Sequence, residues 1–252
     1  MNRITDYPEL KTRIVSWIKD YSTTNNIKSL VVGVSGGIDS AVVSTLCAET
    51  GLPTYVLSMP LLSKVDSDKL SDSHANTLEE KYNNVTKIRV ELSGVYDKFV
   101  HSLNWWTGSY QYTINELANA NTKSRLRMVT LYQVAGTVGG IVVGTGNKVE
   151  DYGVGFYTKY GDGGVDIAPI ADLYKTEVWM LGEYLGIDER IISAPPTDGL
   201  WDDGRTDEDQ IGATYAELEH AMETGEGPGL GPLLKFSGMN SHKMNPIPTF
   251  KL

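Results

Sequence analysis

Apolar residues in this chain occur as short continuous runs, separated by stretches with helical periodicity. The runs are rich in β-branched residues, which is typical of strands buried on both faces of a parallel sheet. We therefore predict strands at 29–34 (SLVVGV), 54–59 (TYVLSM), 86–92 (TKIRVEL) and 139–145 (GGIVVGT).

Helices are predicted before, between and after these strands. Leu10, Ile14, Ile18 and Tyr21 recur at helical spacing, and Pro8 suits the first turn of that helix. Further helices are expected from about Asp39, over 66–82, around 116–136, at 175–185 and at 207–222, where Thr206 and Asp209 approximate a capping box.

Strands that alternate with helices predict an α/β fold, doubly wound, with a mostly parallel sheet and helices on both faces. The C-terminal part is expected to be helical, and residues 1–252 are expected to form one domain. The Gly/Pro-rich segment 224–232 (TGEGPGLGP) indicates a mobile loop before a short tail.

Composition narrows the functional classes. The chain has 252 residues, 40% of them hydrophobic and 21% charged, as in an ordinary globular protein. A net charge of −10 argues against a general nucleic-acid binder. No apolar run approaches the roughly 18 residues of a membrane span. Cys47 is the sole cysteine and lies in an apolar helix, so we expect it to pack in the core of a protein from the reducing cytoplasm.

The segment SGGIDS (35–40) lies between the first strand and the helix that follows, where doubly wound sheets bind ligands. Gly36 and Gly37 allow close approach of the backbone, and the helix N-terminus favours an anion. Ser35 and Ser40 add hydroxyl groups. The segment is not a Walker A loop, because the lysine and the GxxxxGK[S/T] spacing are missing. It is not the dinucleotide-binding GxGxxG motif either.

Asp39 is unexpected inside an anion-binding loop. A carboxylate in a first helical turn can simply stabilise the helix dipole, by about 0.3–1 kcal/mol. Beside a phosphate, however, two unit charges ~4 Å apart repel by about 4 kcal/mol at an effective dielectric of 20. A Mg²⁺ ion between them removes this repulsion, and its preferred ligands are oxygens. Asp39 therefore predicts a metal–nucleotide site.

SGGIDS resembles the pyrophosphate loop of the N-type ATP pyrophosphatases, which adenylate a substrate with ATP. The segments NTKSRLRM (121–128), 144–178 and SAPPTDGL (193–200) resemble NAD synthetases in particular, above all through FYTKYGDGGVD (156–166). The resemblance extends from the first helix to His242 and Lys243. It implies the adenine nucleotide alpha hydrolase-like fold, a homodimer, ATP as co-substrate and Mg²⁺ as cofactor.

The resemblance also implies roles for individual residues. Asp39 and Glu150 match the metal ligands, although the spacing from Lys159 can select Asp151 instead of Glu150. Asp39 and Lys175 are the residues expected to act in catalysis. The positions that match ATP contacts are Gly33, Val34, Ser35, Gly36, Gly37, Ile38, Asp39, Ser40, Thr145, Lys175 and Thr197.

The substrate contacts implied by the resemblance come from three parts of the chain. Each of them also has an ordinary interpretation as a solvated side chain; Arg125, for example, has Lys123 and Arg127 as cationic neighbours. The positions that match contacts to the dinucleotide are Arg125, Lys159, Asp166, His242 and Lys243.

The implied reaction converts deamido-NAD (nicotinic acid adenine dinucleotide) to NAD through an acyl-adenylate, with ammonia as the nitrogen donor. The length of 252 residues leaves no room for a glutaminase domain. Alternatives are another adenylating enzyme, such as a GMP synthetase-like or tRNA-modifying one, or a non-catalytic ATP sensor. Lys64 departs from the family pattern, and Trp105 with Trp106 can serve a nicotinate ring, a dimer contact or core packing.

Overall fold

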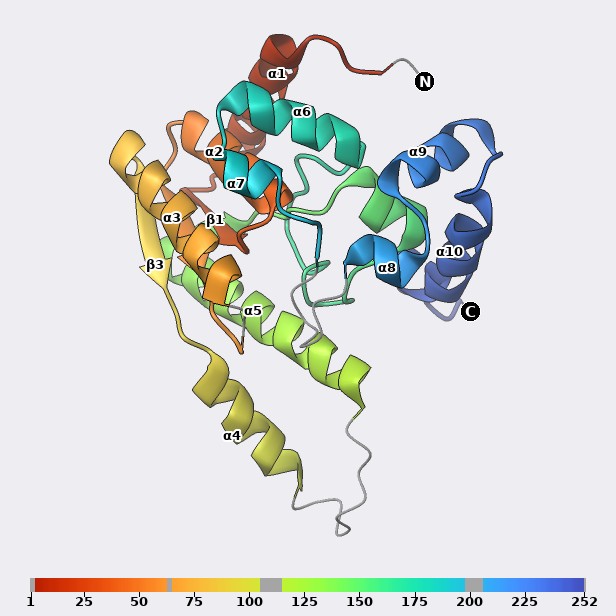
Figure 1. Ribbon diagram of the computed structural model, residues 1–252. Helices are drawn as coiled ribbons and strands as arrows, with labels where there is room; N and C mark the ends of the chain where they lie inside the picture. Colours follow the sequence, from red (N-terminus) through yellow and green to blue (C-terminus); the bar gives the residue numbers. More distant parts are fainter. Residues whose placement is uncertain (1–2, 63–64, 105–114, 198–205, 252) are drawn as a thin grey trace.

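The computed structural model describes residues 3–62, 65–104, 115–197 and 206–251. Its centre is a four-stranded parallel sheet with the order β3-β2-β1-β4 (Figure 1). The α/β fold class is confirmed, and all the predicted strands are present. They are β1 (Ser29–Val34), β2 (Thr54–Ser58), β3 (Val85–Arg89) and β4 (Gly140–Val142).

Helices cover both faces of the sheet because successive strand residues point to opposite sides. Along β1, Val32 belongs to the apolar cluster that includes α1 (Tyr7–Thr24), α2 (Ile38–Glu49) and α3 (Val65–Lys81), whereas Val31 belongs to the cluster on the other face, with α4 (Ser93–Asn104) and α5 (Glu116–Val138). Cys47 is fully buried in the first of these cores, as expected, and burial raises the pKa of its thiol.

The C-terminal helices form a separate apolar cluster beside the sheet (Figure 1). It comprises the π-helical segment η1 (Lys148–Val154) together with α8 (Asp207–Ile211), α9 (Tyr215–Thr224) and α10 (Leu230–Met244). The link to the sheet is made by α6 (Lys175–Leu185), which packs on α2, and α7 (Glu189–Ile192) follows it. Among the described helices, none combines the length and the apolar composition needed to cross a membrane.

Two predictions for the C-terminal part were wrong. The helix expected over 207–222 is broken at Gly212, which adopts a φ of +85° and ends α8 before Thr214 caps α9. The loop predicted over 224–232 is present but shorter, because it ends where α10 begins at Leu230, and the expected short tail is a helix of 15 residues. Leu233 and Phe236 of α10 pack on the C-terminal cluster, and this packing explains why the tail is helical.

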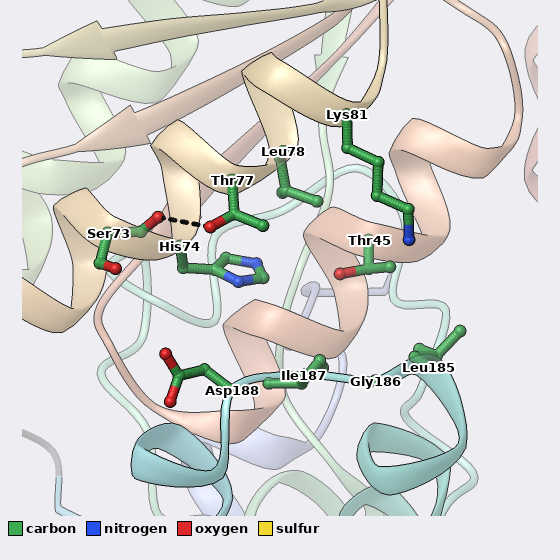
Figure 2. A pocket seen from close by; sticks show the side chains of 10 residues that line it. All are labelled: Thr45, Ser73, His74, Thr77, Leu78, Lys81, Leu185, Gly186, Ile187 and Asp188. Carbon is green, nitrogen blue, oxygen red and sulfur yellow. Dashed lines mark hydrogen bonds between the residues drawn. The ribbon is translucent and has the colours of Figure 1, made fainter.

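A small cavity of about 50 Å³ lies between α2, α3 and the turn from α6 to α7. Figure 2 shows the side chains that line it. His74 is buried against this cavity, and its Nε2 lies 2.9 Å from Ser44 Oγ. Burial lowers the pKa of His74 to about 4, although the nearby Asp188 carboxylate opposes the shift. The imidazole is therefore neutral in the folded protein at neutral pH.

The buried His74 predicts a loss of stability in mild acid. Below pH 6.5 the unfolded chain takes up a proton at this residue, whereas the folded chain does so only near pH 4. We expect this residue alone to reduce the free energy of unfolding by about 3 kcal/mol between pH 7 and pH 4. Urea unfolding of wild type and His74→Gln across this range measures the effect, and the variant should show the weaker pH dependence. Equal pH dependence would contradict the prediction.

Candidate active site

The loop between β1 and α2 leaves a helix N-terminus open at the carboxyl edge of the sheet. Gly36 has a φ of +89°, and a Cβ placed there would lie 2.7 Å from Ser67 O, so only glycine fits. Ser40 Oγ accepts a hydrogen bond from Ser35 N (3.1 Å) and donates one to Gly37 O (2.9 Å). The serine thus shapes the loop. No side chain of the described residues caps α2, so its first N–H groups face the site.

Three charged residues from distant parts of the sequence meet beside this loop. Lys175 Nζ lies 2.5 Å from Asp39 Oδ2 and 2.9 Å from Glu150 Oε1. The lysine side chain is only 3% exposed. Burial alone would lower the pKa of Lys175, but the two carboxylates raise it, so it remains an ammonium. Neither Lys175 nor Glu150 is a solvated surface residue.

Asn147 and Tyr215 hold the carboxylates in place. Asn147 Oδ1 accepts hydrogen bonds from the backbone N–H groups of Val149 and Glu150, both at 3.1 Å, and its Nδ2 donates to Asp39 Oδ1 at 3.2 Å. Tyr215 OH lies 2.6 Å from Glu150 Oε1, and the ring centroid of Tyr215 is 5.0 Å from Lys175 Nζ. Burial and the Glu150 charge raise the pKa of Tyr215, so its hydroxyl stays protonated and donates.

Sequence reasoning missed both of these residues. Asn147 could have been found, because an asparagine before two acids is a typical N-cap. Tyr215 carries no such signal. It reaches the site because α9 packs on η1 and α6, and this packing is a property of the tertiary structure alone.

The geometry distinguishes Glu150 from Asp151. Glu150 shares the Lys175 ammonium with Asp39, whereas Asp151 points toward Gly146, where a Cβ would collide with its carboxylate. Burial and the charge of Glu150 raise the pKa of Asp151 to about 8, so this carboxyl is largely neutral at pH 7. Of the two acids, Glu150 is therefore the one that faces Asp39 and Lys175.

The residues expected to contact the dinucleotide lie in three places. Arg125 is exposed, and its Nε donates to Lys159 O at 3.2 Å. Lys243 Nζ donates to Tyr157 O at 2.5 Å, while the Tyr157 hydroxyl donates to Lys243 O at 2.8 Å. These contacts join α10 to the segment that contains Lys159. His242 is exposed at the end of α10.

Asp166 has a structural role in the free protein. Its Oδ2 accepts from Val142 N at 2.7 Å and its Oδ1 accepts from Tyr132 OH at 3.1 Å. The carboxylate thereby fixes β4 beside α5. Thr145 is half-buried just beyond β4, and Thr197 is exposed at the end of a described segment. Lys64, Trp105 and Trp106 lie outside the described residues.

A second residue of α9, Glu219, holds the first turn of α6 next to Lys175. Its Oε1 accepts from Thr176 N at 2.9 Å and its Oε2 accepts from Thr176 Oγ1 at 2.7 Å. The carboxylate is 1% exposed and is neutralised by Arg3, whose Nη1 lies 2.9 Å away. Tyr215 and Glu219 are four residues apart, so the same face of α9 contacts both Glu150 and the first turn of α6.

Comparison with known proteins identifies the family. The model of the NAD synthase family matches residues 10–236. The chain belongs to the NAD synthase family. It is 41% identical to the NH(3)-dependent NAD(+) synthetase of Carboxydothermus hydrogenoformans, over 88% of either chain.

Two solved structures extend the likeness of this chain to three dimensions. The NMN synthetase of Francisella tularensis has a TM-score of 0.89 at 30% identity and covers 99% of this chain and 100% of its own. The NH3-dependent NAD synthetase of Campylobacter jejuni has a TM-score of 0.75 at 25% identity, with 98% and 100% covered.

The Glu219 contacts yield a prediction about stability. Glu219→Ala removes three part-buried hydrogen bonds and leaves Thr176 N and Arg3 without this acceptor, so the free energy of unfolding should fall by about 2–3 kcal/mol. Glu223→Gln is the matched control, because Glu223 also binds Arg3 at 2.9 Å but is partly exposed and does not contact Thr176. Urea denaturation should show less than about 1 kcal/mol for this control. Equal losses in the two variants would refute the assignment.

Proposed function

We propose that this chain amidates deamido-NAD to NAD with ATP and ammonia, releasing AMP and pyrophosphate. The observation that carries the proposal is the convergence of Asp39 and Glu150 on Lys175 beside the uncapped start of α2. The family match supports the same reaction. Such a site suits a nucleotide polyphosphate, because it combines a helix N-terminus, a buried cation and two hard oxygen donors.

The proposed reaction has two steps. The nicotinate carboxylate attacks the α-phosphorus of ATP, a P–O bond forms, and the bond to the β-phosphate breaks to release pyrophosphate. Ammonia then attacks the acyl carbonyl, loses a proton, and AMP leaves with the bond electrons. The chain has to position the reactants and to neutralise charge on the leaving groups. Lys175 and the free N–H groups of α2 are the groups that face this charge.

The charge balance of the site supports a bound Mg²⁺. Asp39 and Glu150 carry two negative charges against the single positive charge of Lys175. A nucleotide polyphosphate entering this net negative cluster would be repelled. The two carboxylates already share one cation, so their geometry fits a metal ion, which Asp39 and Glu150 would hold. Mg²⁺ there supplies positive charge that offsets the pyrophosphate.

A second candidate substrate is nicotinate mononucleotide. The highest TM-score among the structures compared above, 0.89, is to an NMN synthetase. Amidation of either nucleotide proceeds at the same nicotinate carboxylate, so the Asp39–Glu150–Lys175 cluster serves both equally. Discrimination depends on the contacts to the adenylyl half of the dinucleotide, for which Arg125, Lys159, His242 and Lys243 remain the proposed residues.

We propose free ammonia as the nitrogen donor and the cytoplasm as the site of reaction. The curated relatives of similar length are NH(3)-dependent enzymes. The family match over 10–236 supports one catalytic domain. The buried Cys47 thiol is compatible with a reducing compartment.

We further propose a homodimer formed through α4 and α5. α5 covers one face of the sheet and α4 packs against α5. Both helices carry exposed apolar side chains: Val95, Phe99 and Leu103 on α4, and Leu117, Val129 and Tyr132 on α5. Several exposed apolar side chains on neighbouring helices are typical of a protein interface. A second copy of the chain is the partner that buries the same patch on both sides.

Mass spectrometry of the products tests the function. With ATP, Mg²⁺ and ammonium, deamido-NAD should give NAD and AMP, whereas xanthylate should give no AMP. Asp39→Asn should abolish turnover with an unchanged circular dichroism spectrum, because the variant removes the carboxylate that balances Lys175 and holds Mg²⁺.

The alternatives have distinct outcomes in that assay. A larger kcat/KM with nicotinate mononucleotide would select the shorter substrate. ATP binding without turnover of any acceptor would indicate a sensor.

Sedimentation velocity tests the dimer. Val129→Asp places a charge in the centre of the proposed interface and should convert a dimer into a monomer. Leu234→Asp on α10 is the control, since Leu234 is equally exposed but lies away from α4 and α5, and this variant should remain dimeric. A monomeric wild type at micromolar concentration would refute the proposal.

A further inference from the structure

Arg127 on α5 is a partly buried cation with very few partners. Its Nε donates to Met59 O at 3.2 Å. Within the described segments of the chain, its two terminal nitrogens have no acceptor and no carboxylate at ion-pair distance. Burial lowers the pKa of Arg127, and the more distant Asp68 and Asp162 charges do not fully offset this effect. Buried cations in proteins are normally paired, so this guanidinium lacks an anion.

The position of Arg127 places it beside the phosphate loop. α5 ends where β4 begins, so the helix runs antiparallel to the strands and its N-terminal half lies toward their carboxyl ends. Leu131 of α5 lies next to Gly33, where an added Cβ would be 3.6 Å from its Cδ1. Arg127 is one turn, about 5.4 Å, further toward the carboxyl edge.

The strand register also places Arg127 at the carboxyl edge of the sheet. Val34 of β1 pairs with Ser58 of β2, so Met59 lies beside Ser35. Adjacent strands are about 4.8 Å apart. The carbonyl that Arg127 contacts is therefore about one strand spacing from the start of the loop, at the same edge of the sheet as the N-terminus of α2.

The neighbouring cations on α5 are engaged elsewhere. Arg125 is exposed and contacts Lys159 O, while Lys123 is buried with its Nζ 5.9 Å from the ring centroid of Tyr96. Arg127 alone of these three combines partial burial with a contact at the end of a strand. The planar fork of a guanidinium matches two oxygens of one phosphate.

We propose that Arg127 binds a phosphate group of the nucleotide held by the 35–40 loop. This inference rests on the proposed function only in taking ATP as the ligand. The guanidinium would supply the second wall of the phosphate site, opposite Lys175, and the phosphate would supply the missing anion. Arg127 is thus assigned a direct contact with substrate that the family motifs did not give it.

Titration calorimetry with ATP and Mg²⁺, without an acceptor substrate, tests the contact. Arg127→Gln should weaken binding at least about tenfold, because a charge-assisted bidentate pair is lost. Arg127→Lys should be intermediate, since it keeps the charge but loses the fork. Arg13→Gln is the matched control: Arg13 is exposed on α1, and the variant changes net charge equally but should bind ATP normally. An unchanged Kd for both Arg127 variants would overturn the proposal.

A thermal melt separates this role from a structural one. If Arg127 serves mainly to hold Met59 O, Arg127→Met should lower the Tm of the free protein and leave the Kd for ATP unchanged. If it serves a ligand, the unpaired charge costs stability, so the Tm of the free variant should be equal or higher while ATP stabilises it less than wild type. Should Arg127→Met fail to fold, Arg127→Lys still reports the Kd.

Failure of this inference is distinguishable from failure of the proposed function. Weakened ATP binding in Arg127→Gln supports the contact even if the wild type does not amidate deamido-NAD. Conversely, a wild type that makes NAD while both Arg127 variants bind ATP normally would refute the contact and leave the function standing. Pyrophosphate and AMP, titrated separately, show which phosphate the guanidinium meets.

Discussion

The ammonium of Lys175, shared by Asp39 and Glu150, is the interaction on which the site depends. Asp39 lies at the start of α2, Glu150 in η1 and Lys175 at the start of α6. Three distant parts of the chain therefore meet at one buried positive charge. An ammonium buried to this degree is stabilised by both carboxylates, and two adjacent carboxylates repel each other without it. The ammonium and the two carboxylates therefore stabilise each other.

The surroundings of the cluster keep it rigid. Asn147 caps η1 and at the same time contacts Asp39, so the backbone turn and the side chains are fixed together. Tyr215 and Glu219 act from α9 on Glu150 and on the first turn of α6. The C-terminal helices thus serve as a support for the site and do not merely cover it.

Much of the fold was predictable because its signals are local. Buried parallel strands are continuous apolar runs, and the strand at 29–34 was predicted to the residue. The start of α6 at Lys175 was also correct. The errors arose where tertiary packing decides. Gly212 breaks a helix that periodicity alone would continue, and α10 forms from a Gly-containing segment because Leu233 and Phe236 meet an apolar cluster.

The site shows the same division. Asp39 was identified by a physical contradiction within six residues of sequence, and Glu150 and Lys175 followed from family resemblance. Coordinates were needed to show that Glu150 and not Asp151 contacts Lys175, since counting residues cannot say which carboxylate faces the lysine. Tyr215 contacts Glu150, which is 65 residues away in the sequence, and Arg127 contacts Met59, which is 68 residues away. Sequence periodicity reports only on near neighbours and cannot predict such contacts.

Opposite ends of the sequence contribute to this one site. Arg3 neutralises Glu219 beside α6, and Lys243 of α10 exchanges contacts with Tyr157 in the segment after η1. An affinity tag fused directly before Arg3 or inserted into α10 would therefore disturb the catalytic region, even though both positions are remote from the phosphate loop along the chain. For the same reason, permuting the chain would require a linker that leaves both contacts intact.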